Sequence, residues 1–259
     1  MSAGTLAQGR NLWRIYGLEA KYELFKLLRL PMYAIPTLAF PLMFYLLFGV
    51  SMKSGAFSMG TYLLATYGSF GVMGAALFGF GVGIAIERGQ GWMLFKRATP
   101  MPPLAHIFGK LVMCLVFAVI LVGALFTLGL TVGGVHQPAG TLAALAGVLV
   151  AGAIPFAAFG LALGSWLGPN SAPAIVNLIY LPAAFASGMW FPIQMLPRFF
   201  RELAPFLPPY HYAQLALRMI GMAKEGRPAV SVAVLAVFTV LSLVLASVGI
   251  RRDEGRTFG

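Results

Sequence analysis

The residues that could carry acid–base or metal chemistry are few in this chain of 259 residues, which has seven Asp and Glu residues and three histidines. His106, His136 and His211 lie far apart, in different predicted loops. No motif of the His-Glu-x-x-His, Gly-x-Ser-x-Gly or Gly-x-x-x-x-Gly-Lys-Ser/Thr type is present. We therefore expect no constellation of these groups, no catalytic residue, no metal site and no cofactor bound to this chain.

A short polar stretch at residues 87–110 interrupts the apolar sequence instead. The 33 residues before it, 54–86, contain no Asp, Glu, Lys or Arg, and neither do the 87 residues after it, 111–197. Its own charged residues cluster at Glu87-Arg88, Lys96-Arg97 and Lys110. A polar loop in this place is expected to contact something outside the membrane.

Composition explains why those runs should be membrane spans. The chain is 59% hydrophobic and 10% charged, with a mean hydropathy of +0.86, whereas soluble domains carry about 25% charged residues. The apolar runs are continuous and do not alternate every second residue, which favours helices over a barrel. The 31 glycines suit close helix packing in lipid. The single cysteine, Cys114, lies in an apolar run and is expected to pack in the core.

Runs of about 20 apolar residues are needed to cross the hydrocarbon layer, and six such segments are expected. The prediction is an all-α integral membrane protein with spans at 30–52, 59–86, 111–132, 141–167, 174–191 and 229–250. Residues 192–228 are rich in proline and charge but also apolar, which predicts short helices that re-enter the interface. Gly160, Gly164 and Gly168, spaced four apart, predict a close-packing face on the fourth span.

Basic residues at the ends of the apolar runs are expected to orient these spans in the membrane. The net charge of the chain, +11, is therefore not taken to indicate nucleic-acid binding. With the N-terminus inside, 12 Lys and Arg lie on the cytoplasmic side and 6 outside. This bias places both termini and residues 87–110 in the cytoplasm, and residues 192–228 outside. Residues 1–29 predict an amphipathic helix, with Glu19, Glu23 and Lys26 along one polar edge; it could lie at the interface or be a solvated helix.

An ion-driven secondary transporter would keep ionisable groups at membrane depth. None lies inside a predicted span here, and Glu87 stands at a boundary. If the protein moves a substrate uphill, we expect another chain to supply the energy.

The polar stretch, the proline-rich segment and the six-span layout together resemble the ABC-2 type permeases, the membrane subunits of ABC exporters. The resemblance covers nearly the whole chain. In residues 87–110 it is carried by Glu87, Arg88, Gly91, Leu94, Lys96, Arg97, Thr99 and Pro100. In the external segment it is carried by Ser187, Gly188, Phe191, Pro192, Pro197, Pro205, Pro208 and Pro209, whereas His211-Tyr212 departs from an expected Thr-Tyr.

What the resemblance implies is a dimer of permease copies, identical or paralogous, in the inner or plasma membrane, with an ABC ATPase docked under each copy. ATP and magnesium would bind those ATPases. Residues 87–110 would form the coupling loop that carries a coupling helix, and the ATPase contact would centre on residues 87–104, with Trp92, Met93, Leu94 and Phe95 as apolar anchors and Arg88, Lys96 and Arg97 as rim charges. The docking residues that the resemblance implies are Glu87, Arg88, Gly91, Trp92, Leu94, Phe95, Lys96, Arg97, Thr99 and Pro100. The cargo would be drug-like, lipid or glycan. The alternatives are aromatic residues that only pin the loop to the interface, a non-transporting scaffold, and a secondary transporter.

Overall fold

The computed structural model describes residues 3–29, 31–50, 59–92, 101–223 and 227–257. The described residues contain helices and connecting segments but no β-strand, so the predicted all-helical class is confirmed for them. Among them, four helical stretches are long and apolar enough to cross a membrane: Met59–Gly89, Leu104–Thr131, Ala139–Trp166 and Pro228–Arg252. Two shorter apolar helices accompany them, Ile35–Val50 and Ala172–Ala186.

Helix α3 (Met59–Ala76) is the centre of the molecule, and every residue in it after Met59 is buried. It continues without interruption into the π-helix η2 (Leu77–Val82) and then α4 (Gly83–Gly89). The long helix α6 (Pro103–Thr131) packs along α3. Residues 87–89 and 103–110 of the predicted loop are therefore the helical ends of α4 and α6.

The two helices before α3 pack on different partners. Helix α1 (Ala3–Leu28) packs on α6, and α2 (Pro31–Phe44) packs on α3. Pro36 and Pro41 lie inside α2, where each removes a backbone donor. The helix then continues as the π-helix η1 (Tyr45–Val50), a wider turn with i→i+5 hydrogen bonds.

Glycine backbones allow the next layer to approach the core closely. Helix α7 (Ala139–Ala151) and α8 (Ala153–Trp166) run in sequence, and α12 (Pro228–Thr257) lies on α8. A Cβ added at Gly164 would lie 2.7 Å from the carbonyl oxygen of Gly81, and one at Gly160 would lie 3.1 Å from the nitrogen of Gly81. The predicted close-packing face therefore includes Gly160 and Gly164. It excludes Gly168, which is exposed beyond the end of α8.

Short helices that start at prolines fill the segment after α9 (Ala172–Ala186). Pro192 and Pro197 precede helix starts, Pro205 lies in the first turn of a 3-10 helix, and Pro208 begins α11. Proline suits such starts because its fixed φ matches a first turn that lacks donors anyway. The elements are η3 (Ile193–Met195), α10 (Arg198–Leu203), η4 (Ala204–Phe206) and α11 (Pro208–Met219).

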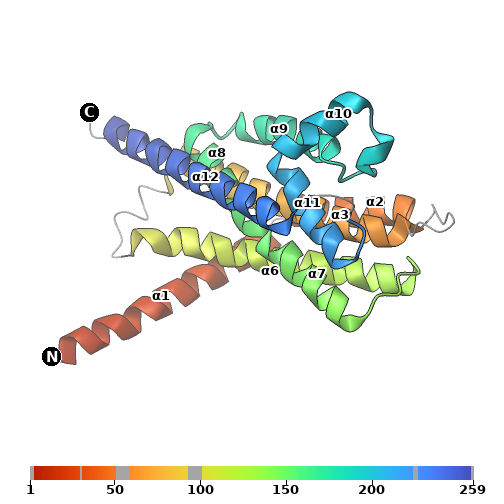
Figure 1. Cartoon of the computed structure of the whole chain (residues 1–259). Helices are drawn as coiled ribbons and strands as arrows, with labels where there is room; N and C mark the ends of the chain where they lie inside the picture. The colour runs from red at the N-terminus through yellow and green to blue at the C-terminus, as the bar shows by residue number, and fades with distance from the viewer. Residues whose placement is uncertain (1–2, 30, 51–58, 93–100, 224–226, 258–259) are drawn as a thin grey trace.

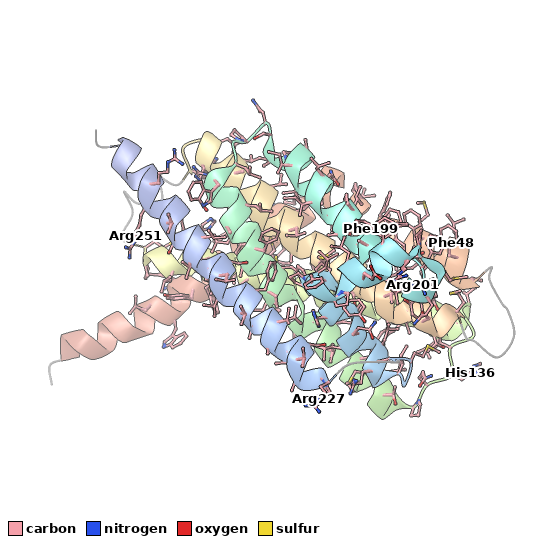
Figure 2. The ribbon with its side chains drawn as sticks, turned by 45° about the horizontal axis from the view of Figure 1, so that its top comes forward. Phe48, His136, Phe199, Arg201, Arg227 and Arg251 are labelled. Carbon is pink, nitrogen blue, oxygen red and sulfur yellow. The ribbon has the colours of Figure 1, made fainter. Side chains whose placement is uncertain are left out.

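The helices run roughly along one long axis, so the molecule has two distinct ends (Figure 1). The start of α1, the close of α12 and the helix ends on both sides of residues 90–102 lie at one end, which we call the loop end. The turn after α6 and the short helices η3 and α10 lie at the opposite, re-entrant end. Figure 2 shows Arg251 at the loop end and His136, Phe48 and Arg201 at the re-entrant end.

Candidate functional site

Three helices bring charged side chains together at the loop end. Glu19 and Glu23 are one turn apart on α1, His106 and Lys110 are one turn apart on α6, and Glu87 is near the end of α4. Residues four apart lie on the same face of a helix, so each pair projects as a unit. We call Glu19, Glu23, Lys26, Glu87, His106 and Lys110 the ion cluster.

The imidazole of His106 lies at the middle of the ion cluster. Its Nδ1 is 3.1 Å from Oε1 of Glu19 and 3.2 Å from Oε1 of Glu23. Its Nε2 is 2.9 Å from Oε2 of Glu87. Every ring nitrogen of His106 thus faces a carboxylate, and those carboxylates come from two different helices.

Two ammonium groups complete the cluster. The Nζ of Lys110 donates to Oε2 of Glu23 at 3.2 Å and to Oε1 of Glu87 at 2.9 Å. Lys26 donates to the same Oε1 of Glu87. Glu23, Glu87, His106 and Lys110 are each at most 4% exposed, while the Lys26 side chain is 48% exposed. Most of the cluster is therefore buried, and it reaches the surface at Lys26.

The expectation that the acidic residues and histidines form no constellation was wrong. It failed because Glu19 and His106 are 87 positions apart and meet only when α1 folds onto α6. The sequence did contain one signal: an acidic i,i+4 pair, Glu19/Glu23, and a basic i,i+4 pair, His106/Lys110, with the same spacing. Pairing across helices cannot be deduced from that spacing alone.

Close backbone approach makes the contact between α1 and α6 possible. A Cβ added at Gly109 would lie 3.0 Å from Cγ of Glu19 and 3.3 Å from the backbone nitrogen of Ala20. Next to it, the rings of Tyr16 and Phe108 meet edge to face at 5.3 Å. The face of α1 that carries Tyr16, Glu19 and Glu23 therefore packs on α6, although the sequence predicted that the two glutamates lie along a polar edge. Tyr22 and Phe25 are exposed.

The electrostatics of the cluster favour charged carboxylates. Burial by itself raises the pKa of Glu23, but the hydrogen bond from His106 and the charge of Lys110 outweigh it and lower that pKa to about 2. Counting His106 as protonated, the three carboxylates face three cations. Removing one partner of such a buried group leaves an uncompensated charge, which typically costs about 3–5 kcal/mol.

Glu19, Glu23 and His106 each offer one possible metal-ligand atom, and these atoms lie within 4.8 Å of one another. The Nζ of Lys110, however, lies against the second oxygen of Glu23. With lysine and imidazolium charges present, the carboxylates are neutralised without a divalent cation. We therefore interpret these residues as ion-pair partners and assign no metal to them.

The predicted docking residues divide into three groups. Glu87 is buried in the ion cluster, and Arg88 turns inward to donate from its guanidinium to the carbonyl oxygens of Gly164 at 2.7 Å and Leu167 at 3.4 Å, at the end of α8. Gly91 adopts φ +75°, which a residue with a side chain rarely does, and Trp92 is 51% exposed. The remaining six lie outside the described residues: Leu94, Phe95, Lys96, Arg97, Thr99 and Pro100.

The predicted external motif lies at the re-entrant end. Ser187 follows α9, and Gly188 turns the chain with φ +72°. The carbonyl of Gly188 accepts a hydrogen bond of 2.8 Å from the Tyr62 hydroxyl. The Trp190 ring packs 6.0 Å from Phe44, 5.8 Å from Phe70 and 6.0 Å from Phe185. This contact set fixes the segment to α2, α3 and α9.

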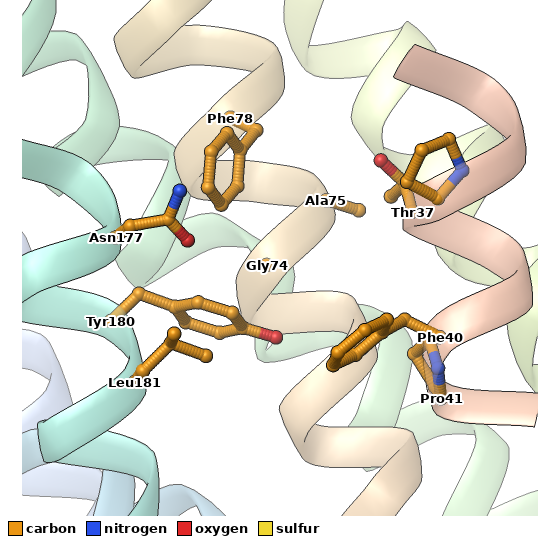
Figure 3. A pocket seen from close by; sticks show the side chains of 11 residues that line it. Thr37, Phe40, Pro41, Gly74, Ala75, Phe78, Asn177, Tyr180 and Leu181 are labelled. Atoms are coloured by element: carbon orange, nitrogen blue, oxygen red, sulfur yellow. The ribbon is translucent and has the colours of Figure 1, made fainter. Parts of the chain in front are cut away.

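A pocket of about 300 Å³ lies between α2, α3 and α9, with η2 at one side (Figure 3). Phe40 and Pro41 line it from α2, Gly74 and Ala75 from α3, and Leu181 from α9. Asn177 and Thr37 add polar atoms to an otherwise apolar wall. The pocket is lined by groups that suit an apolar or amphipathic molecule.

Comparison with known proteins agrees with these features. The family model of the "ABC-2 family transporter protein" matches residues 34–248. A relative from Bacillus subtilis (strain 168), named "Putative transport permease YvfS", is 24% identical over 235 residues, which cover 90% of this chain and 95% of that protein. The family consists of membrane subunits, not catalytic ones. From the all-helical fold with its apolar spans and the match across most of its length, this chain belongs to the ABC-2 transporter family.

Proposed function

We propose that this chain is the permease subunit of an ATP-driven ABC exporter, and that a separate ATPase binds ATP and magnesium. The observation that carries the proposal is the family match over residues 34–248, in a sequence that has no Gly-x-x-x-x-Gly-Lys-Ser/Thr. Energy for transport would then enter through a protein contact. The exposed Trp92, beside the turn at Gly91, is a suitable apolar anchor for that contact.

The proposed membrane arrangement has six spans with both termini in the cytoplasm. The four long apolar stretches would supply four spans, and Ile35–Val50 and Ala172–Ala186 the other two. The excess of basic residues at the termini and at residues 87–110 supports this orientation. So does the position of α1, the close of α12 and the flanks of residues 90–102 at one end of the molecule (Figure 1). In a bacterial cell the membrane would be the inner or plasma membrane.

The proposed working assembly has two permease copies and two ATPases. ATPase closure would press on residues 87–110 of each copy and rotate its helices as rigid bodies, opening a path between the copies. The pocket between α2 and α9 would accept the apolar part of a drug-like, lipid or glycan-linked cargo.

The test is ATP-dependent transport by vesicles that contain the permease and a candidate partner ABC ATPase. Phe95→Ala and Trp92→Ala should abolish ATP-dependent transport and the effect of cargo on ATPase rate, while membrane insertion stays normal. Phe206→Ala is the matched control, because Phe206 is an aromatic residue 81% exposed in η4, outside residues 87–110. Normal transport by both loop variants would contradict the proposal. ATPase binding without any transport would indicate a scaffold, and transport driven by an ion gradient without ATP a secondary transporter.

A further inference from the structure

The ion cluster contains a protonation problem that the proposed function does not address. Nδ1 of His106 faces Glu19 and Glu23 on α1, and Nε2 faces Glu87 on α4, at 3.1, 3.2 and 2.9 Å. A neutral imidazole carries one N–H and one lone pair. In the neutral form, one ring nitrogen would therefore turn its lone pair toward an ionised carboxylate.

Only the imidazolium form satisfies both sides, because both of its nitrogens donate. The charged groups around it lead to the same conclusion. Glu19, Glu23 and Lys26 face the cluster from α1, Glu87 from α4, and Lys110 from the next turn of α6. Helix α2, which also packs on α1 and α6, has no Asp, Glu, Lys, Arg or His in its sequence. Among the residues that the structure describes in this cluster, three carboxylates and two lysines leave one negative charge, which one proton on His106 balances.

We propose that His106 is held as an imidazolium and acts as the positioning group that locks α1 to both flanks of the coupling loop. One nitrogen holds α1, and the other holds α4 through Glu87, which lies just before residues 90–102. His106 itself lies on α6, just after residues 90–102. A single charged ring thus joins α1, α4 and α6.

The functional consequence rests on the proposed function. If an ATPase presses on the loop, the lock makes α1, α4 and the start of α6 move as one rigid body. Without the lock, α1 would not follow α4 and α6, and less of the movement would be transmitted to α3. His106 is 4% exposed, so it would act through Glu19, Glu23 and Glu87 and not by touching the ATPase.

The lock is tested on the permease alone. Spin labels on Tyr22→Cys of α1 and Leu104→Cys of α6, both well exposed, report the distance between these helices, with Cys114→Ala removing the native thiol. His106→Gln leaves one buried negative charge unbalanced and should widen the distance distribution roughly twofold. His136→Gln is the matched control, because His136 is exposed and its Nδ1 contacts the carbonyl of Gly134, two residues away.

A second substitution that restores the charge balance distinguishes the effect of the lost charge from the effect of altered packing. The double variant His106→Gln, Glu19→Gln removes one positive and one negative charge and keeps Lys26 and Lys110 with their carboxylates. It should recover a narrow distribution. In protein with 15N-labelled histidine, the His106 signals, identified by their loss in His106→Gln, should show protons on both ring nitrogens at neutral pH.

An unprotonated ring nitrogen on His106, or an unchanged distribution in His106→Gln, would overturn the proposal. So would a chelator that loosens α1 in the unaltered protein, since a bound metal would then be the lock. ATP-dependent transport by the same variants is measured separately. If the distance and NMR results hold but no ATPase associates with the permease, the proposed function fails and the lock stands.

Discussion

The two ends of this permease are held together by different chemistry. At the loop end, buried charges join α1, α4 and α6, with Lys110 at 2% exposure between Glu23 and Glu87. At the re-entrant end, aromatic rings and tyrosine hydroxyls join the short helices to α2, α3 and α9. The described ion pair there, Arg198–Glu202, is 85% and 64% exposed.

The contrast matters because the two kinds of contact fail differently. A buried charge that loses its partner is costly, so the loop end should be either fully assembled or open. Rings and hydroxyls contribute about 0.5–1.5 kcal/mol each, so the re-entrant end can lose one contact and keep its form. Contacts that break all together, as at the loop end, suit the transmission of a rigid-body movement. Contacts that can be lost one by one, as at the re-entrant end, suit a segment that moves in small steps.

The largest expected effect comes from Lys110→Gln. The change leaves two buried carboxylates short of a cation and should destabilise the protein by about 3–5 kcal/mol. Thermal unfolding in detergent measures the loss. Arg198→Gln is the matched control at the re-entrant end, where an exposed pair is worth about 0–1 kcal/mol. Equal shifts for the two variants would remove the contrast between the ends.

The second-largest effect is expected from low pH, which should separate α1 from α6 at the loop end. The folded pKa of Glu23, about 2, lies below its ordinary value of 4.5, so its contribution is complete above pH 4.5 and is lost as the pH falls toward 2. The distance between labels on Tyr22→Cys and Leu104→Cys should increase across that window. Glu23→Gln should weaken the pH dependence of this distance, because the Glu23 carboxyl group no longer titrates. An increase in distance centred near pH 4.5 would show that the pKa of Glu23 is not lowered and that its carboxylate is not held by its cationic partners.

Much of this architecture could be predicted from the sequence, because long uncharged runs can only be apolar helices. The fold class follows from residues 54–86 and 111–197, and the family from residues such as Ser187, Gly188 and Pro192. These are local signals. The proline positions also predict broken, short helices before the last long one, which the structure contains.

The ion cluster was not predicted, because its members are neighbours only in three dimensions. Glu87 was assigned to a surface contact and Arg88 to its rim, yet both side chains bond within the chain. The local sequence around a charged residue beside an apolar run is the same whether its side chain faces a partner protein or the interior of its own chain. The side chain turns inward when another helix presents the opposite charge, and here that depends on where α1 packs. The docking role of Leu94, Phe95, Lys96, Arg97, Thr99 and Pro100 stays a prediction.

A smaller effect is expected from Gly164→Ala, between the two ends. The added Cβ would lie 2.7 Å from the Gly81 carbonyl oxygen and 3.0 Å from Cβ of Ile84, so α8 must move away from η2 and α4. Overpacking of this kind costs about 1–3 kcal/mol. Gly147→Ala on the exposed side of α7, where nothing lies within 4 Å, is the control. If both variants unfold at the same temperature, the close contact of α8 with η2 is wrong.

The smallest effect should come from Tyr62→Phe at the re-entrant end. The variant keeps the ring but removes the hydroxyl that donates to the Gly188 carbonyl at 2.8 Å, which leaves a buried acceptor without that donor. The expected loss is about 1 kcal/mol. Tyr22→Phe, on the exposed side of α1, should change nothing measurable. The turn at Gly188 is also held by its neighbours, since Trp190 packs on three rings and Tyr67 donates to its carbonyl. A loss as large as that of Lys110→Gln would mean that the hydroxyl alone holds the turn, and the re-entrant end would then be all-or-none like the loop end.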